Sequence, residues 1–221
     1  MATVFILAGS PVARAQGQTN SPFNENSLSP FERELLNEIN QTRTHPDEYA
    51  GHLEELKPRF NGKEFKLPGR DAVLTEEGWA AAEDAISYLC SIQPASPLTL
   101  SRGLYLAAQQ HVNDQGPKGS TGHKGSDGSM VEERIARFGT WDGAIGEDIF
   151  YGDQTARERI LLWLIDDGVP SRGHRKRLVS PDYKFVGVSC GPHVKFGTMC
   201  VITFAGGFSE KTGASQATKL P

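Results

Sequence analysis

Apolar residues recur at helical spacing in five segments of this 221-residue chain. The first helix should begin with Ser29 as its cap, because proline follows at the first turn and glutamate comes three residues after the serine. It should end at His45, since a residue that precedes proline avoids the helical region. The other helices are expected over about residues 75–93, 101–114, 129–138 and 155–166, and the last is apolar enough in its second half (ILLWLI) to be buried nearly all round.

Strand-like runs are fewer and lie in the second half of the chain. They cover residues 144–151, 185–190 and 199–204. Two segments interrupted by glycine and proline, 51–74 and 116–128, indicate a long connection and an exposed loop. Helices flank strands here without the alternation of a doubly wound sheet, so the pattern favours an α+β fold with antiparallel layering.

The two ends of the chain differ from its middle. An apolar run over residues 2–8 precedes Ala13-Arg14-Ala15, an A-x-A pattern typical of signal cleavage, although the usual positive n-region is missing. Residues 1–15 are therefore interpreted as a truncated secretion signal, with a disordered N-terminal tail as the alternative. Residues 16–30 read as a linker, 31–208 as one domain and 209–221 as a disordered tail. Hydrophobic residues make up 38% of the chain, which is enough for a sizeable core in that domain.

Two of the three cysteines lie on neighbouring strand-like runs. Cys190 ends the first run, Cys200 lies within the second, and the connection between them begins and ends with glycine, as hairpin loops often do. Opposed positions on antiparallel strands bring Cα atoms within disulfide range. In an exported chain this predicts a Cys190–Cys200 disulfide. Cys90 falls on the apolar face of a predicted helix and is expected to be a buried, inert thiol.

Charge and hydropathy limit the possible partners. The formal net charge is −4 and the sequence pI is about 5.9, which argues against nucleic acid, because proteins that bind it carry a basic footprint. No run approaches the roughly 18 apolar residues that a transmembrane segment requires. With the interpreted signal, these features predict a secreted or periplasmic protein.

Four residues that can bind a metal or move a proton lie at the edges of predicted elements: His123, Glu147, Asp166 and His174. If they converge, the imidazoles of His123 and His174 would suit zinc or another divalent metal, and the carboxylates would complete the shell. The same groups would also suit general acid–base work. They are 24, 19 and 8 residues apart, so their spacing also allows separate loop and cap residues.

Other polar and aromatic residues receive simpler interpretations. Ser171 is expected to cap a short helical turn over residues 172–178 rather than to act as a nucleophile. Trp163 and His111 are expected to pack in the core. A group of cations is interpreted as a solvated face, with a phosphate or acidic glycan as the alternative ligand: Arg172, Arg175, Lys176 and Arg177.

Five motifs, in order between about residues 31 and 208, resemble those of the CAP family (the cysteine-rich secretory, antigen 5 and pathogenesis-related group). They are LLNEINQTR at 35–43, similar to the family's L-x-x-x-N-x-x-R helix; PL at 97–98 with the helix that follows; GEDI at 146–149, similar to G-E-N-I; Trp163 with GHR at 173–175; and VGV at 186–188.

The resemblance implies a three-layer α-β-α sandwich with a mainly antiparallel central sheet. It also implies a cleft tetrad at His123, Glu147, Asp166 and His174. Aspartate at position 166 departs from the commoner glutamate, Asp148 replaces asparagine, and the helix expected over 75–92 is additional to the minimal family domain.

Three functions are compatible with such a site. The preferred one is a binding module for a lipid, glycan or protein ligand, with divalent-metal binding as a further expectation. A metal-dependent, peptidase-like hydrolase would use His123 and His174 to hold the ion and Glu147 as the base. The third possibility is a purely structural tetrad.

Overall fold

The computed structural model describes residues 23–211. The interpreted signal lies outside the described residues, as do residues 16–22 of the interpreted linker and the interpreted tail from residue 212. The helices are α1 Pro30–Thr44, α2 Pro46–Glu54, α3 Trp79–Ser91, α4 Arg102–Gln115, α5 Val131–Ala136, α6 Ala156–Ile165 and α7 Gly173–Val179. Three short 3₁₀ turns cover Glu25–Ser27, Lys57–Arg59 and Gly116–Lys118.

The central sheet has four strands in the order β4-β6-β7-β5. These strands are β4 Thr99–Leu100, β5 Gly139–Tyr151, β6 Phe185–His193 and β7 Gly197–Glu210. Only the short β4 is parallel to its neighbour, and the other two pairings are antiparallel. The mainly antiparallel α+β architecture expected from the sequence is therefore confirmed.

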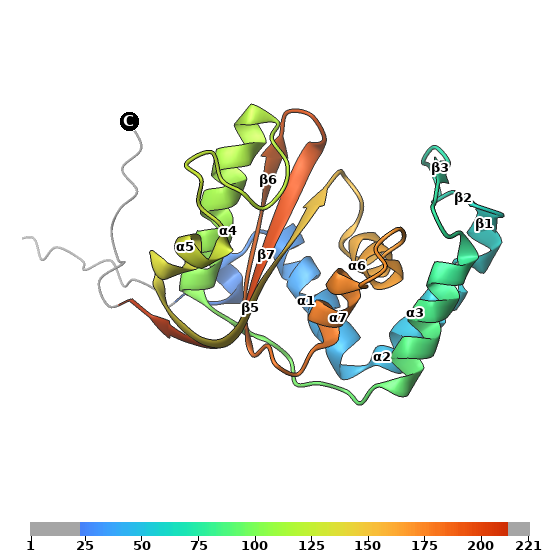
Figure 1. The fold of residues 1–221 in the computed structure, drawn as a ribbon, viewed down its shortest axis with the longest axis horizontal. Helices are drawn as coiled ribbons and strands as arrows, with labels where there is room; N and C mark the ends of the chain where they lie inside the picture. The colour runs from blue at the N-terminus through green and yellow to red at the C-terminus, as the bar shows by residue number, and fades with distance from the viewer. Residues whose placement is uncertain (1–22, 212–221) are drawn as a thin grey trace, which may run out of the picture.

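Helices cover both faces of this sheet (Figure 1). Helices α4 and α5 lie on one face, α1, α6 and α7 lie on the other, and α2 and α3 form an outer layer beyond α6. Side chains along β7 alternate between the two faces of the sheet, so apolar residues pack on both. Ile202 and Phe204 pack toward α1 and α6, whereas Val201 packs against α4.

A glycine allows α4 to approach the sheet closely. A Cβ atom at Gly187, the middle residue of the VGV motif, would lie 2.1 Å from backbone atoms of Leu104 and Tyr105 in α4. No side chain could be accommodated there without moving the helix.

Several local expectations are confirmed. The Ser29 hydroxyl accepts a hydrogen bond from the Glu32 amide (3.2 Å), and the Glu32 carboxylate accepts one from the Ser29 amide (2.8 Å), which forms the expected capping box. Helix α1 ends at Thr44, with His45 as its C-cap. A disulfide joins Cys190 and Cys200, which face each other on β6 and β7.

Other local expectations were wrong. The connection expected over 51–74 begins inside α2 and contains a small antiparallel sheet of two-residue strands, β1 Phe60–Asn61, β2 Glu64–Phe65 and β3 Val73–Leu74. Helix α3 begins four residues later than expected, at Trp79, and Cys90 is an exposed free thiol rather than a buried one. Strand β7 continues to Glu210, so the interpreted tail does not begin at residue 209. No helix between residues 23 and 211 is both long and apolar enough to cross a membrane.

Candidate functional site

The four predicted site residues form two histidine–carboxylate pairs. His123 lies in the loop after α4, and its Nδ1 atom is 2.9 Å from Oε1 of Glu147 on β5. His174 is the second residue of α7, and its Nδ1 atom is 2.7 Å from Oδ1 of Asp166, the C-cap of α6. Each carboxylate is buried, whereas the His123 and His174 side chains are 48% and 31% exposed.

Glu147 is held by a buried arginine that the sequence analysis did not assign to the site. Nη2 of Arg134 in α5 donates to Oε2 of Glu147 at 2.6 Å, and both side chains are 1% exposed. Burial alone would raise the pKa of Glu147. The hydrogen bond from His123 and the charge of Arg134 outweigh this effect and leave the pKa below its ordinary value. Arg134 also donates to the His123 carbonyl (3.0 Å), so it positions both members of the pair.

Asp166 fixes the second imidazole through both carboxylate oxygens. Besides the ring contact, Oδ2 accepts a hydrogen bond from the His174 amide at 3.0 Å. The hydrogen bond from His174 to Asp166 raises the pKa of the imidazole, although partial burial opposes the shift. The ring lies nearly parallel to that of Trp163, at an interplanar angle of 10° and a centroid distance of 6.1 Å. Trp163 is buried, as expected, and also limits the orientation of His174.

The pKa of Asp148 is affected by the histidines of both pairs. It follows Glu147 on β5, and successive strand residues point to opposite faces of a sheet. Its carboxylate is fully buried and forms an ion pair with Arg177 of α7. Burial raises the pKa of Asp148 to about 6, against the opposing charges of Arg177, His174 and His123. Both imidazoles are therefore close enough to Asp148 to perturb its pKa.

The cations after α6 do not form a solvated face. Arg172 pairs with Glu77 and Asp84, Arg175 is buried and pairs with Asp84, and Arg177 pairs with Asp148. The expected Ser171 cap is also wrong: Arg172 is the N-cap of α7, with φ 52° and ψ 44°, and its own side chain does not cap the helix.

The arrangement limits which atoms can ligate a metal. Both oxygens of Glu147 and both oxygens of Asp166 already accept hydrogen bonds. An ionised carboxylate only accepts, so each facing imidazole, when neutral, carries its proton on Nδ1 and has a free lone pair on Nε2. Within residues 23–211, neither Nε2 atom has a hydrogen-bond partner, and no group of three or more histidine, cysteine or acidic side chains is arranged to hold a metal.

One comparison decides the family. The model of the cysteine-rich secretory protein (CAP) family matches residues 36–204. The chain belongs to the CAP family. A comparison with curated protein sequences found no significant match.

Two solved structures resemble this CAP domain. An extracellular protein containing an SCP domain, from Bacillus anthracis, is 21% identical with a TM-score of 0.40; the match covers 50% of this chain and 34% of the other. An outer surface protein from Borrelia burgdorferi is 19% identical with a TM-score of 0.40, and that match covers 49% of this chain and 76% of the other. The chain thus spans about a third of the first of these proteins.

Sequence reasoning missed the cations that support this CAP site. Arg134 lies between Val131 and Ile135, two residues that pack in the core, and it is itself buried. A charged residue on the apolar face of an amphipathic helix is a signal for a buried ion pair. Arg177 belonged to the group of cations interpreted as a solvated face, and nothing local distinguishes it from Lys176.

Proposed function

We propose that this CAP-family chain is an exported binding module in which His123 and His174 hold a divalent cation and present it to a ligand. The observation that carries the proposal is the state of the two imidazoles. Each ring is fixed at Nδ1 by a buried carboxylate, and each Nε2 is free in a partly exposed side chain. Histidine ligands are commonly oriented in this way by a carboxylate behind the ring.

Zinc fits these donors by its chemistry. Imidazole nitrogen is a preferred zinc ligand, and zinc normally takes four ligands. His123 and His174 supply two nitrogens, and the oxygens of Glu147 and Asp166 are occupied, so water or an external ligand would supply the remainder. Two protein ligands make a weak site whose affinity increases when a partner contributes a donor atom, which favours a binding role.

The partner is proposed to be a lipid, a glycan or a protein, met outside the cytoplasm. The Cys190–Cys200 disulfide supports export, because disulfides persist in oxidising compartments. The A-x-A pattern at Ala13–Ala15 supports the same location from the sequence.

The hydrolase alternative is less well supported. A general base must have a free oxygen within reach of the proton that it removes. Both oxygens of Glu147 are engaged by His123 and Arg134, and its pKa is below the ordinary value, which disfavours proton uptake.

Calorimetric titration with zinc tests the proposal. The wild type should bind saturably, and a His123→Ala/His174→Ala variant should lose the binding. A His45→Ala/His52→Ala variant, which removes the same number of imidazoles elsewhere, should bind like the wild type. Absence of binding by the folded wild type, or retention of wild-type affinity in the first variant, would overturn the metal proposal.

A further inference from the structure

The connection between α6 and α7 has an unusual backbone at both ends. Asp166 at its start and Arg172 at its end both have a φ of 52°, and they are the only non-glycine residues with positive φ among residues 23–211. The left-handed region costs free energy for residues with a Cβ atom. Such conformations persist where surrounding contacts over-determine them. Because Asp166 orients His174, those contacts bear directly on the candidate site.

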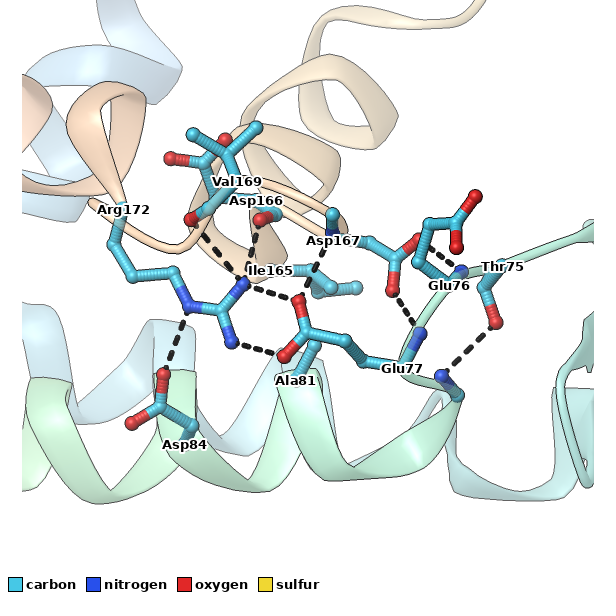
Figure 2. Close-up of polar contacts among 12 residues, drawn as sticks. Thr75, Glu76, Glu77, Ala81, Asp84, Ile165, Asp166, Asp167, Val169 and Arg172 are labelled. Atoms are coloured by element: carbon cyan, nitrogen blue, oxygen red, sulfur yellow. Dashed lines mark hydrogen bonds and ion pairs between the residues drawn. The ribbon is translucent and has the colours of Figure 1, made fainter.

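The segment that leads into α3 supplies part of the support (Figure 2). The Asp167 carboxylate accepts hydrogen bonds from the amides of Glu76 (2.7 Å) and Glu77 (2.8 Å). In return, Oε1 of Glu77 accepts a hydrogen bond from the Gly168 amide at 2.9 Å. Each segment therefore binds backbone amides of the other with an acidic side chain.

Arg172 closes the arrangement from the other end of the connection. Its Nη1 and Nη2 atoms each lie 2.6 Å from an oxygen of Glu77, and its Nε atom lies 3.1 Å from Oδ2 of Asp84. The same Nη1 donates to the carbonyl of Asp166 at 2.8 Å. The Arg172 side chain is only 13% exposed. A planar guanidinium that binds a carboxylate through two nitrogens fixes orientation as well as distance.

Arg175, in helix α7, binds both α3 and the end of α6. Its Nη1 atom lies 2.8 Å from Oδ2 of Asp84, and its Nε atom donates to the carbonyl of Leu164. His174 thus lies between two arginines that are both bound to Asp84 of α3.

We propose that Glu77 and Asp84 are positioning residues for His174. Through Arg172, Arg175 and the backbone of Asp166–Arg172, the outer α2–α3 layer holds the Asp166 carboxylate where it fixes the imidazole and directs Nε2 outward. This inference rests on the proposed function, because it assigns residues that prepare the same site for a cation. The inference thus gives helix α3, which is additional to the minimal family domain, a role in supporting the site.

The test compares Glu77→Gln with Glu76→Gln. Both variants remove one negative charge from adjacent positions, but the Glu76 carboxylate makes no hydrogen bond or ion pair with any described residue. The readout is the tautomer of each imidazole, measured from nitrogen-15 chemical shifts at one alkaline pH at which both rings are neutral. Zinc affinity is then measured on the same samples.

The wild type and Glu76→Gln should show His174 protonated on Nδ1. In Glu77→Gln, His174 should shift toward the Nε2-protonated form while His123 is unchanged, and zinc affinity should fall several-fold. Unchanged tautomers in a folded Glu77→Gln protein would overturn the inference. If that variant does not fold, Asp84→Asn should show the same shift of His174 alone, and its absence there would overturn the inference equally. The tautomer does not require zinc, so wild type that fails to bind zinc contradicts the proposed function and leaves this test intact.

Discussion

The two histidine–carboxylate pairs have similar contacts but are supported in different ways. Glu147 belongs to β5, whose backbone is paired with β7 along most of its length, and a buried arginine neutralises the carboxylate. Asp166 begins a connection whose backbone is left-handed at both ends and which depends on residues of a separate layer. The first pair therefore shares the stability of the core, whereas the second can be altered without disrupting the sheet.

The largest effect is expected where the first pair meets the core. Arg134→Met leaves the Glu147 carboxylate buried without its cation, which should lower the free energy of unfolding by about 3–5 kcal/mol. Urea denaturation measures this loss. Arg137→Met is the matched control, because its ion pair with Asp127 is exposed and should contribute far less to the free energy of unfolding. Equal losses of unfolding free energy in the two variants would show that the buried Arg134–Glu147 pair contributes no more to stability than the exposed Arg137–Asp127 pair.

A smaller effect is expected at Asp148, which lies next to both pairs. Its folded pKa of about 6 is above the ordinary 3.8, so the folded state binds this proton more tightly than the unfolded state. The contribution of Asp148 to wild-type stability should therefore fall as pH rises from about 4 to about 6, by on the order of 2–3 kcal/mol. Asp148→Asn should lack this loss.

The measurement is the difference in unfolding free energy between Asp148→Asn and wild type across that pH range. The difference should move in favour of the variant and become constant above about pH 7. Asp142→Asn, an exposed position on the same strand, should follow the wild type throughout. A constant difference for Asp148→Asn would mean that the carboxylate is not desolvated in the folded protein.

The smallest effect is expected from the second pair. The folded pKa of His174 is raised, so its contribution is complete below the unfolded value of 6.5 and is lost as pH rises through the folded value. Because the ring is 31% exposed, the loss should stay below about 1 kcal/mol. Thermal unfolding of His174→Gln and wild type at about pH 5 and about pH 9 measures it. The stability advantage of wild type over His174→Gln should be larger at the lower pH, and a larger advantage at the higher pH would contradict the prediction.

Elements with strong local signals were predictable from the sequence. Helix α1 has a capping box and a proline at its start, and α6 has an apolar run that only a buried helix explains. The disulfide followed from two strands and a glycine-bounded loop. Helix α2 was missed because Pro46 was treated only as the end of a helix, although proline is equally favourable in the first turn of the next one.

Features that depend on distant partners were not predictable. Strand β5 begins at Gly139 because β7 extends to Glu210 and pairs with it, and neither run reads as a strand alone at that end. The four site residues were selected by residue type and by their places at the edges of predicted elements, and the motif resemblance implied that they share a cleft. Their division into two pairs, with Arg134 behind one and Glu77 acting through Arg172 near the other, depends on tertiary contacts that no spacing encodes.

The adjacency of Glu147 and Asp148 makes the site sensitive to strand register. On β5 these two residues face opposite sides of the sheet and serve different partners, Arg134 on one side and Arg177 on the other. A one-residue slip of β5 against β7 would turn both side chains to the opposite face of the sheet, so that neither carboxylate would meet its present arginine. Correct pairing of β5 with β7 therefore positions Glu147 and Asp148 together, and a slip would break both ion pairs at once.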